Sequence, residues 1–299
     1  MLPTASSIVE KLPRLLRRHR LMTTWMKLTG EDPVQLIRIR DNSFGYADMS
    51  DGFLRLIVID KDYNADFFHI ADTLLAKGGT FLDVGANYGL LSLGLAGRHG
   101  TAIDFHLFEP NPKLVASIKR SAALYPSVCF TLNVAAVSDK KGSVSFVINE
   151  VQTGVSHIAA VDEYGIQVPG IDLDSYINDQ NLDNINLLKL DIEGYELPAL
   201  LGAQHSLEER RIGAVYFEYF EKQLIRVGPP GELIDFLSSV GFVTCFARAC
   251  DWEPRGGPTH TIASNRPGHG LKLLPVLGHA RPAMTDLFAL PREHLEPLE

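Results

Sequence analysis

The chain has 299 residues, of which 45% are hydrophobic, with a formal net charge of -8 and three cysteines. Its length and hydrophobic content suffice for the core of one large domain. The acidic balance disfavours a nucleic-acid partner, because a phosphate backbone would be repelled overall. The cysteines form no CxxC pair, which argues against a disulfide framework or a zinc site and favours a reducing, cytoplasmic location.

Residues 1–62 are predicted to form a helix followed by short strands. Within them, residues 7–28 mix apolar and basic side chains, a pattern typical of a helix that packs on its own domain or contacts a membrane surface or a lipid-linked acceptor. The chain has no apolar run long enough to span a membrane and no apolar segment ending in a cleavage site of small residues. We therefore expect neither a membrane span nor export.

Residues 63–251 are predicted to form one α/β domain, because strand-like and helix-like apolar segments alternate along them. Residues 140–175 instead contain short strands and glycine turns, which indicates a β-rich insertion. Part of this insertion, residues 149–170, is expected to form a mobile cover over the acceptor site. Glycine and proline accumulate after residue 251, so residues 252–299 are predicted to be a loosely ordered tail.

The stretch TFLDVGANYGLLSLGLA predicts a strand, a tight turn and a helix. Gly85 directly follows the predicted strand, where glycine can adopt the positive φ of a tight turn. The free N–H groups at the start of the following helix would point toward a ligand. Asn87 stands where a dinucleotide fingerprint would have its second glycine, which favours S-adenosylmethionine over NAD. Asp83 would meet the cationic amino-acid portion of that cofactor or, alternatively, cap the helix.

The second predicted strand, IDFHLFEPNP, ends in Glu109. A carboxylate at the carboxyl end of this strand can accept hydrogen bonds from both hydroxyls of a ribose. The apolar strand directs Glu109 toward the crevice in which α/β proteins bind their ligands. We therefore interpret Glu109 as the ribose-binding residue rather than as a solvated surface glutamate.

Four ordered motifs, TFLDVGANYG, FHLFEPNP, LNVAAVSD and LLKLDIEGYE, resemble the FkbM-type methyltransferases. The resemblance implies a class I methyltransferase fold, a Rossmann-like, doubly wound, seven-stranded and mostly parallel sheet, and O-methylation of a sugar, glycan or natural-product hydroxyl with S-adenosylmethionine. It covers about residues 63–246. The residues that it implies for cofactor binding are Asp83, Gly85, Asn87 and Gly89 on the methionine side, Glu109 at the ribose, and the turn of Asn133, Val134 and Ala135 at the adenine edge.

The predicted reacting end lies in NLLKLDIEGYE and AVYFEYFEK. Lys189 and Asp191 share one face of their strand, and Glu193 follows in the turn. A lysine inside an apolar strand needs a carboxylate partner or a lowered pKa, and Asp191 or Glu218 could be that partner. The cluster is either a catalytic group facing the acceptor hydroxyl, in which Asp191 also borders the cofactor, or a structural ion pair.

Two further options remain at this end of the predicted site. Asp191, Glu193 and Glu218 could hold a divalent cation such as magnesium, but Lys189 would compete for the same place, so we favour a site without metal. His157 is a second candidate base near neutral pH, although a histidine in a loop is more often a surface or packing residue. Five aromatic residues could stack on a sugar ring, although most of them are expected to belong to the core: Tyr164, Tyr195, Phe217, Tyr219 and Phe220.

Two other functions compete with methyl transfer. An NAD-dependent oxidoreductase would use the same crevice but needs a tighter glycine pattern than this turn has. A non-catalytic S-adenosylmethionine-binding protein would keep the pocket without the polar groups at its reacting end. The presence of Lys189, Asp191 and Glu218 favours an enzyme.

Overall fold

The computed structural model describes residues 18–54, 64–160, 162–246, 260–262, 271–276, 284–294 and 296–297. Residues 7–17 of the predicted basic helix lie outside the described residues. Residues 18–28 of it form most of helix α2 (Arg18–Thr29). Within the described part of the chain, no helix has the length and apolar character needed to cross a membrane.

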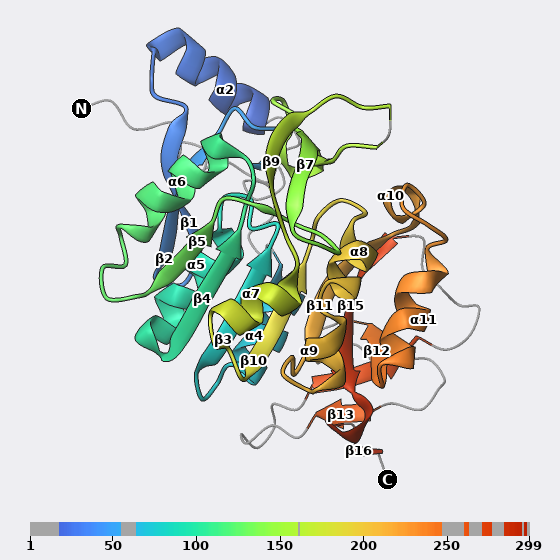
Figure 1. Cartoon of the computed structure of the whole chain (residues 1–299). Helices are drawn as coiled ribbons and strands as arrows, with labels where there is room; N and C mark the ends of the chain where they lie inside the picture. The colour runs from blue at the N-terminus through green and yellow to red at the C-terminus, as the bar shows by residue number, and fades with distance from the viewer. Residues whose placement is uncertain are drawn as a thin grey trace.

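A ten-stranded sheet forms the centre of the molecule (Figure 1). Its strand order is β16-β13-β14-β12-β15-β11-β10-β3-β4-β5. Neighbours among the five strands from β11 to β5 in this order pair in parallel, whereas β15 runs antiparallel to both β11 and β12. The strands are β3 (Gly79–Val84), β4 (Ile103–Phe108), β5 (Phe130–Asn133), β10 (Ile185–Leu190), β11 (Val215–Phe220), β12 (Phe242–Phe246), β13 (His260–Ile262), β14 (Leu271–Pro275), β15 (Met284–Pro291) and β16 (Glu296–Pro297).

The chain starts this sheet at β3 and adds strands first on one side and then on the other. Strands β4 and β5 follow outward from β3, and the chain then returns to place β10 and β11 on the opposite side. The direction of winding therefore reverses between β3 and β10. Ligands of open α/β sheets bind outside the carboxyl ends of the strands at such a reversal.

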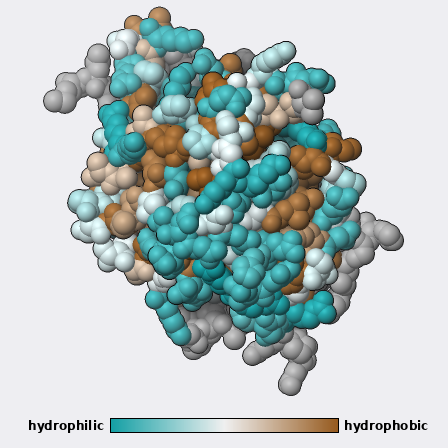
Figure 2. Space-filling view, viewed as in Figure 1, coloured by the Kyte–Doolittle hydropathy of each residue, from teal (hydrophilic) through white to brown (hydrophobic). Residues whose placement is uncertain are grey.

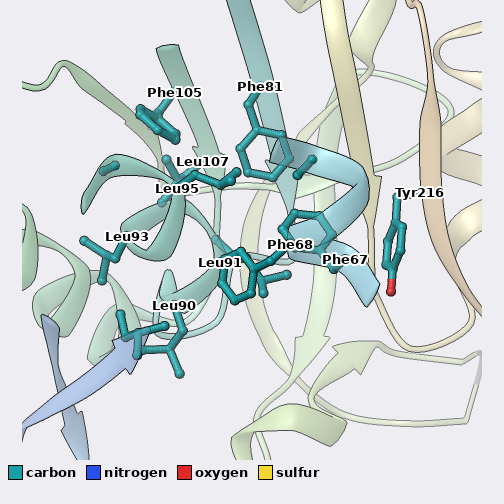
Figure 3. Close-up of a cluster of buried hydrophobic side chains, with 14 of the residues drawn as sticks. Phe67, Phe68, Phe81, Leu90, Leu91, Leu93, Leu95, Phe105, Leu107 and Tyr216 are labelled. Carbon is teal, nitrogen blue, oxygen red and sulfur yellow. The ribbon is translucent and has the colours of Figure 1, made fainter. Parts of the chain in front are cut away.

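Helices cover both faces of the sheet, which confirms the predicted doubly wound α/β fold. One core contains apolar side chains of α4, α5 and α6, and Figure 3 shows Phe67 and Phe68 of α4 packed near Phe81 of β3. The opposite core contains side chains of α7, α8, α9, α10 and α11. The helices are α4 (Ala65–Leu74), α5 (Leu90–His99), α6 (Pro112–Ala122), α7 (Leu173–Asp179), α8 (Glu196–Leu201), α9 (Gln204–Glu208), α10 (Glu221–Leu224) and α11 (Gly231–Ser239), with a 3-10 turn η1 (Gly100–Ala102) after α5.

Strand alternation explains why both cores are apolar. Phe81 belongs to the core on the α4 and α5 side, whereas Leu82 and Val84 belong to the opposite core. Successive side chains of a strand point to opposite faces, and a strand covered on both faces is therefore a continuous apolar run. On the outside, Figure 2 shows hydrophilic residues gathered over α7 and α9.

The segment after β5 forms a second, four-stranded sheet with the order β6-β9-β7-β8. Its strands are β6 (Ala136–Val137), β7 (Gly142–Val147), β8 (His157–Ile158) and β9 (Ile166–Ile171), and the 3-10 turn η2 (Thr153–Val155) lies between β7 and β8. Ala136, Phe146 and Val168 form its small apolar core. In Figure 1 this sheet stands beyond one end of the central strands.

A hairpin of β1 (Val34–Arg40) and β2 (Ser43–Asp48) precedes the central sheet in the chain and packs against its helices. Ser43 donates a hydrogen bond to the carbonyl of Gly94 in α5 at 3.0 Å, and the amide of Tyr46 donates to Ser121 of α6 at 2.8 Å. The segment FLRLIVID, residues 53–60, is predicted to form the next short strand, and all of it after residue 54 lies outside the described residues.

The prediction of a loosely ordered tail is wrong for the described residues after 252. Strand β15 fills the gap between β11 and β12, and Leu287, Phe288 and Ala289 are fully buried there. The segment MTDLFALP is apolar enough for a central strand. The glycine and proline residues that precede it in the chain obscured this signal.

Candidate active site

A cavity of about 300 Å³ opens at the carboxyl ends of β3, β4, β10 and β11. One side is formed by the turn after β3, and another by the second sheet with the loop between β7 and β8. Its lining includes Phe53, Gly85, Ala86, Asn87, Tyr88, Glu109, Ala135, Val137, Phe146, Thr153, Ile158, Lys189, Asp191, Glu193, Glu218, Phe220 and Gln223. The cavity therefore lies where the winding of the sheet reverses.

The turn after β3 requires glycine at its first position. Gly85 has a φ of 75°, and a Cβ added there would lie 2.0 Å from the carbonyl oxygen of Asp191. The amides of Gly85 and Ala86 both donate to the carbonyl of Phe108 at 3.0 Å. Asn87 also has positive φ and lines the cavity, whereas Gly89 begins α5 outside the lining. The turn thus presents backbone directly to a ligand.

Glu109 is buried at the end of β4 and connects this strand to the turn. Its Oε2 accepts a hydrogen bond from the amide of Asn87 at 2.8 Å, and its Oε1 accepts one from the amide of Asn111 at 2.8 Å. Burial raises the pKa of Glu109 to about 7, although these two hydrogen bonds act in the opposite direction. The carboxylate lines the cavity at the place predicted for the ribose.

Asp83 does not line the cavity, in contrast to the prediction that it meets the cofactor. It is fully buried, its Oδ1 lies 3.2 Å from the ammonium of Lys189, and its Oδ2 accepts a hydrogen bond from Ser92 at 2.6 Å. Strands β3 and β10 pair with Asp83 directly opposite Lys189. The main partner of Lys189 is therefore Asp83 rather than Glu218, and Asp191 is a second partner at 3.6 Å.

The ammonium of Lys189 also holds the glycine turn. It donates to the carbonyl of Gly85 at 2.7 Å and to that of Val84 at 3.3 Å. Burial lowers the pKa of Lys189, but the charges of Asp83 and Asp191 outweigh this effect, so the net pKa is raised. A raised pKa favours the protonated form of Lys189, which donates hydrogen bonds and has no lone pair to accept a proton.

Three carboxyl groups gather at the end of the cavity beyond Lys189. Asp191, Glu193 and Glu218 each offer an oxygen within 4.8 Å of the others, an arrangement that could also hold a cation. Burial, followed by the charge of Asp191, raises the pKa of Glu193 to about 8 and that of Glu218 to about 9. Gln223 donates to Glu193, whereas Oε2 of Glu218 is buried and has no hydrogen-bond partner in the part of the chain that the structure describes. We refer to these three residues as the carboxyl cluster.

The raised pKa of Glu218 predicts a pH-dependent stability. The folded protein retains a proton up to about pH 9 that the unfolded chain releases near 4.5, so the free energy of unfolding falls as the pH rises between these values. Each unit of pKa difference corresponds to about 1.4 kcal/mol. Glutamine does not titrate, so Glu218→Gln should not show this fall in the free energy of unfolding. The melting temperature of the variant, measured by calorimetry, should therefore exceed that of the wild type more at pH 9 than at pH 5. An equal difference at both pH values would contradict a raised pKa.

The remaining predicted residues divide between the cavity wall and its surroundings. Ala135 lines the cavity, but Asn133 is not part of the lining and donates to the hydroxyl of Tyr176 at 3.0 Å. His157 does not line the cavity. Its Nδ1 lies 3.0 Å from the carbonyl of Val155 and its Nε2 lies 3.0 Å from Glu163, so both ring nitrogens contact groups of the protein.

Sequence reasoning missed a buried glutamate that shapes the carboxyl cluster. Oε1 of Glu196 accepts hydrogen bonds from the amides of Ile192 at 2.9 Å and Gly194 at 3.3 Å. The residue between them, Glu193, has a φ of 59°. Glu196 thus stabilises the left-handed turn that carries Glu193 into the cavity. The motif DIEGYE contains this signal, since its second glutamate begins a helix.

The fold defines a Rossmann-like α/β protein, and the cavity lies at the reversal of its sheet. A family model described as the methyltransferase FkbM domain matches residues 83–244, more than half of the chain. The chain therefore belongs to the FkbM methyltransferase family, which confirms the resemblance seen in the four motifs. The order β5-β4-β3-β10-β11-β15-β12 with β15 antiparallel gives the predicted seven strands of a class I methyltransferase, and β13, β14 and β16 extend it. No curated protein matches the chain.

Several solved methyltransferase structures are similar to the chain. The FkbM methyltransferase of Methylobacillus flagellatus is 17% identical with a TM-score of 0.39, and the match covers 55% of this chain and 37% of that one. The chain thus spans little more than a third of that relative. An S-adenosylmethionine-dependent O-methyltransferase of Thermotoga maritima is 13% identical with a TM-score of 0.39, and the match covers 89% of this chain and 80% of that one.

Proposed function

We propose that the protein is an S-adenosylmethionine-dependent O-methyltransferase that acts on a hydroxyl group of a sugar, glycan or other natural product. The observation that carries this proposal is one cavity lined by two sets of groups that lie at different strands of the sheet. Glu109 and the Gly85 turn lie at β4 and β3, which we call the first end of the cavity, and the carboxyl cluster lies at β10 and β11, which we call the second end. A nucleoside cofactor and a hydroxyl acceptor can therefore meet between them.

The residues of the first end fit the cofactor. Glu109 can accept from ribose hydroxyls with the lone pairs that its two backbone hydrogen bonds leave free. Ala135, Val137 and Phe146 offer an apolar wall for a planar base. The Gly85 turn brings backbone groups close to the amino-acid portion, since no side chain stands in the way.

The residues of the second end fit an acceptor that must be positioned and deprotonated. Bound S-adenosylmethionine supplies an activated methyl group, so the protein must hold the acceptor oxygen and receive its proton. Positioning is worth roughly 7 to 11 kcal/mol, whereas a general base adds about 10² to 10⁴ in rate. Glu218 can receive the proton once it is ionised, because its Oε2 has no hydrogen-bond partner among the described residues. Phe220 lines the same end and offers a face for a sugar ring.

Membership of the methyltransferase family overturns the interpretation as an NAD-dependent oxidoreductase. A non-catalytic S-adenosylmethionine-binding protein would retain the first end of the cavity only. Glu218 at the second end favours an enzyme, because its buried Oε2 has no hydrogen-bond partner among the described residues, and a buried polar atom of this kind is costly to keep without a function.

The test begins with cofactor binding. Wild-type protein should bind S-adenosylhomocysteine with a dissociation constant in the micromolar range, about -8 kcal/mol. Glu109→Ala should weaken binding more than tenfold, because it removes the proposed ribose contact and leaves the amides of Asn87 and Asn111 without an acceptor. Glu150→Ala, at an exposed residue, is the matched control. Equal titration heats for wild type and Glu109→Ala would remove Glu109 from cofactor recognition.

The second part of the test concerns the reaction. Methyl-labelled S-adenosylmethionine should transfer its label to an acceptor in a screen of sugars, glycans and hydroxylated natural products. Transfer to nitrogen or carbon acceptors only would contradict O-methylation. The absence of both cofactor binding and transfer would contradict the proposed function as a whole.

A further inference from the structure

Asp51 is a buried carboxylate that precedes the family domain in the chain, and only 4% of its surface is exposed. Its Oδ2 accepts hydrogen bonds from the hydroxyl of Thr153 at 2.5 Å and from that of Tyr88 at 3.0 Å. Its Oδ1 accepts from the amides of Phe53 at 3.0 Å and Thr153 at 3.1 Å. One carboxylate thus connects three separate segments of the chain.

Each of these segments contributes to the wall of the cavity. Tyr88 belongs to the turn after β3, Thr153 begins η2 in the predicted cover, and Phe53 lies two residues after Asp51. All three line the cavity, whereas Asp51 itself does not. Asp51 therefore acts on the cavity through its partners and not by direct contact with a ligand.

The backbone of the segment that contains Asp51 also lies against the cover. The amide of Gly52 donates to the carbonyl of Val151 at 2.9 Å. A Cβ added to Gly154 would lie 2.7 Å from the ring of Phe53, so the two segments are in close contact. The hydroxyl of Thr153 in addition lies 3.4 Å from the side-chain oxygen of Asn87. Asn87 and Tyr88 belong to the turn after β3, which we call the cofactor turn. The predicted cover is thus joined to the rest of the site at Thr153.

The chemistry of these contacts makes the connection strong. Hydrogen bonds to a carboxylate are about twice as strong as bonds between neutral groups, and burial strengthens them further. Burial, followed by the charge of Asp51, raises the pKa of Tyr88 far above its usual value, so Tyr88 remains a hydroxyl donor. Among the described residues, Asp51 is the carboxylate that accepts hydrogen bonds from both Thr153 and Tyr88, and the other side-chain contact of the Thr153 hydroxyl is the amide oxygen of Asn87.

We propose that Asp51 is a positioning residue that fixes the cover loop at Thr153 to the cofactor turn at Tyr88 and thereby sets the cavity wall against which the cofactor binds. The identity of that cofactor rests on the proposed function. The hydrogen bonds between Thr153 and Asp51 join protein groups only, so they do not depend on which cofactor binds. A segment outside the matched family domain thus completes the cofactor site.

The first experiment measures cofactor affinity with variants of Thr153. Thr153→Val has nearly the same shape but lacks the hydroxyl, and Thr153→Ser keeps the hydroxyl. We expect Thr153→Val to raise the dissociation constant of S-adenosylhomocysteine, and the KM for S-adenosylmethionine, about tenfold with kcat within threefold. Thr153→Ser should stay within threefold of the wild type. Equal affinities for Thr153→Val and the wild type would overturn the proposal.

The second experiment does not depend on the proposed function. Hydrogen exchange of the Thr153 amide in ligand-free protein should accelerate at least tenfold in Asp51→Ala, because this amide loses its acceptor. The amide of Leu188 in the central sheet should exchange at the wild-type rate, which separates local release from general unfolding. Asp48→Ala, at a carboxylate that accepts from Ser50, is the matched control and should leave the Thr153 amide protected.

The outcomes of the two experiments are distinguishable. If the wild type binds no cofactor but Asp51→Ala releases the Thr153 amide, the proposed function fails and the positional role stands. If Thr153 stays protected in Asp51→Ala while Leu188 is unchanged, Asp51 does not fix the cover and the proposal is wrong. If Asp51→Ala does not fold, the pair Thr153→Val and Thr153→Ser decides by the affinity measurement alone.

Discussion

Lys189→Met is expected to destabilise the protein by about 3 to 5 kcal/mol, because it leaves the buried charge of Asp83 without its partner. It should also weaken binding of S-adenosylhomocysteine more than tenfold, since the carbonyls of Val84 and Gly85 lose their donor and the cofactor turn loses its support. Chemical denaturation measures the first effect, and calorimetric titration measures the second.

The double variant Asp83→Asn/Lys189→Met separates these two effects. It removes the uncompensated charge, so a substantial part of the stability should return. Cofactor binding should remain weak, because the turn still lacks the ammonium. Full cofactor affinity in the folded double variant would show that Lys189 does not support the turn. Loss of turnover with unchanged cofactor affinity would instead restore the predicted role of Lys189 toward the acceptor.

Local patterns explain what the sequence predicted correctly. The apolar runs of β3, β4 and β10 are long enough to be recognised as buried strands, and the glycine turn after β3 has its own signature. The alternation of strands and helices then leaves few topologies. Glu109 directly follows the apolar run of β4, and this position alone predicts that it lies at the carboxyl end of the strand.

Contacts between distant segments explain what the sequence did not predict. The pairing of Asp83 with Lys189 depends on the register of β3 and β10, which are far apart in the chain. Asp51 lies in a region without any recognised motif, and its partners are known only once the cover and the cofactor turn are folded together. Strand β15 follows a segment rich in glycine and proline, which gives no local signal of a strand. Its place in the sheet results from its pairing with β11 and β12, which precede it in the chain.

The largest expected effect on the rate is that of Glu218→Gln. If Glu218 receives the proton of the acceptor hydroxyl, the isosteric amide should lower kcat by about 10² to 10⁴ while cofactor affinity stays within threefold. A base acts only when it is ionised. Because burial and the charge of Asp191 raise the pKa of Glu218 to about 9, kcat/KM of the wild type should rise with pH toward that value, and this rise should be absent in the variant.

Glu193→Gln is the matched control for Glu218→Gln. Glu193 belongs to the same carboxyl cluster but is already bonded to Gln223, so its substitution should lower kcat less than that of Glu218 and should leave the rise with pH in place. A chelator distinguishes the other use of the cluster. Loss of wild-type activity with a chelator and its recovery with magnesium would make Asp191, Glu193 and Glu218 ligands of a cation. If Glu218→Gln and chelation both leave the rate unchanged, the carboxyl cluster does not take part in the reaction, and the acceptor must be deprotonated by solvent or by a group outside the described residues.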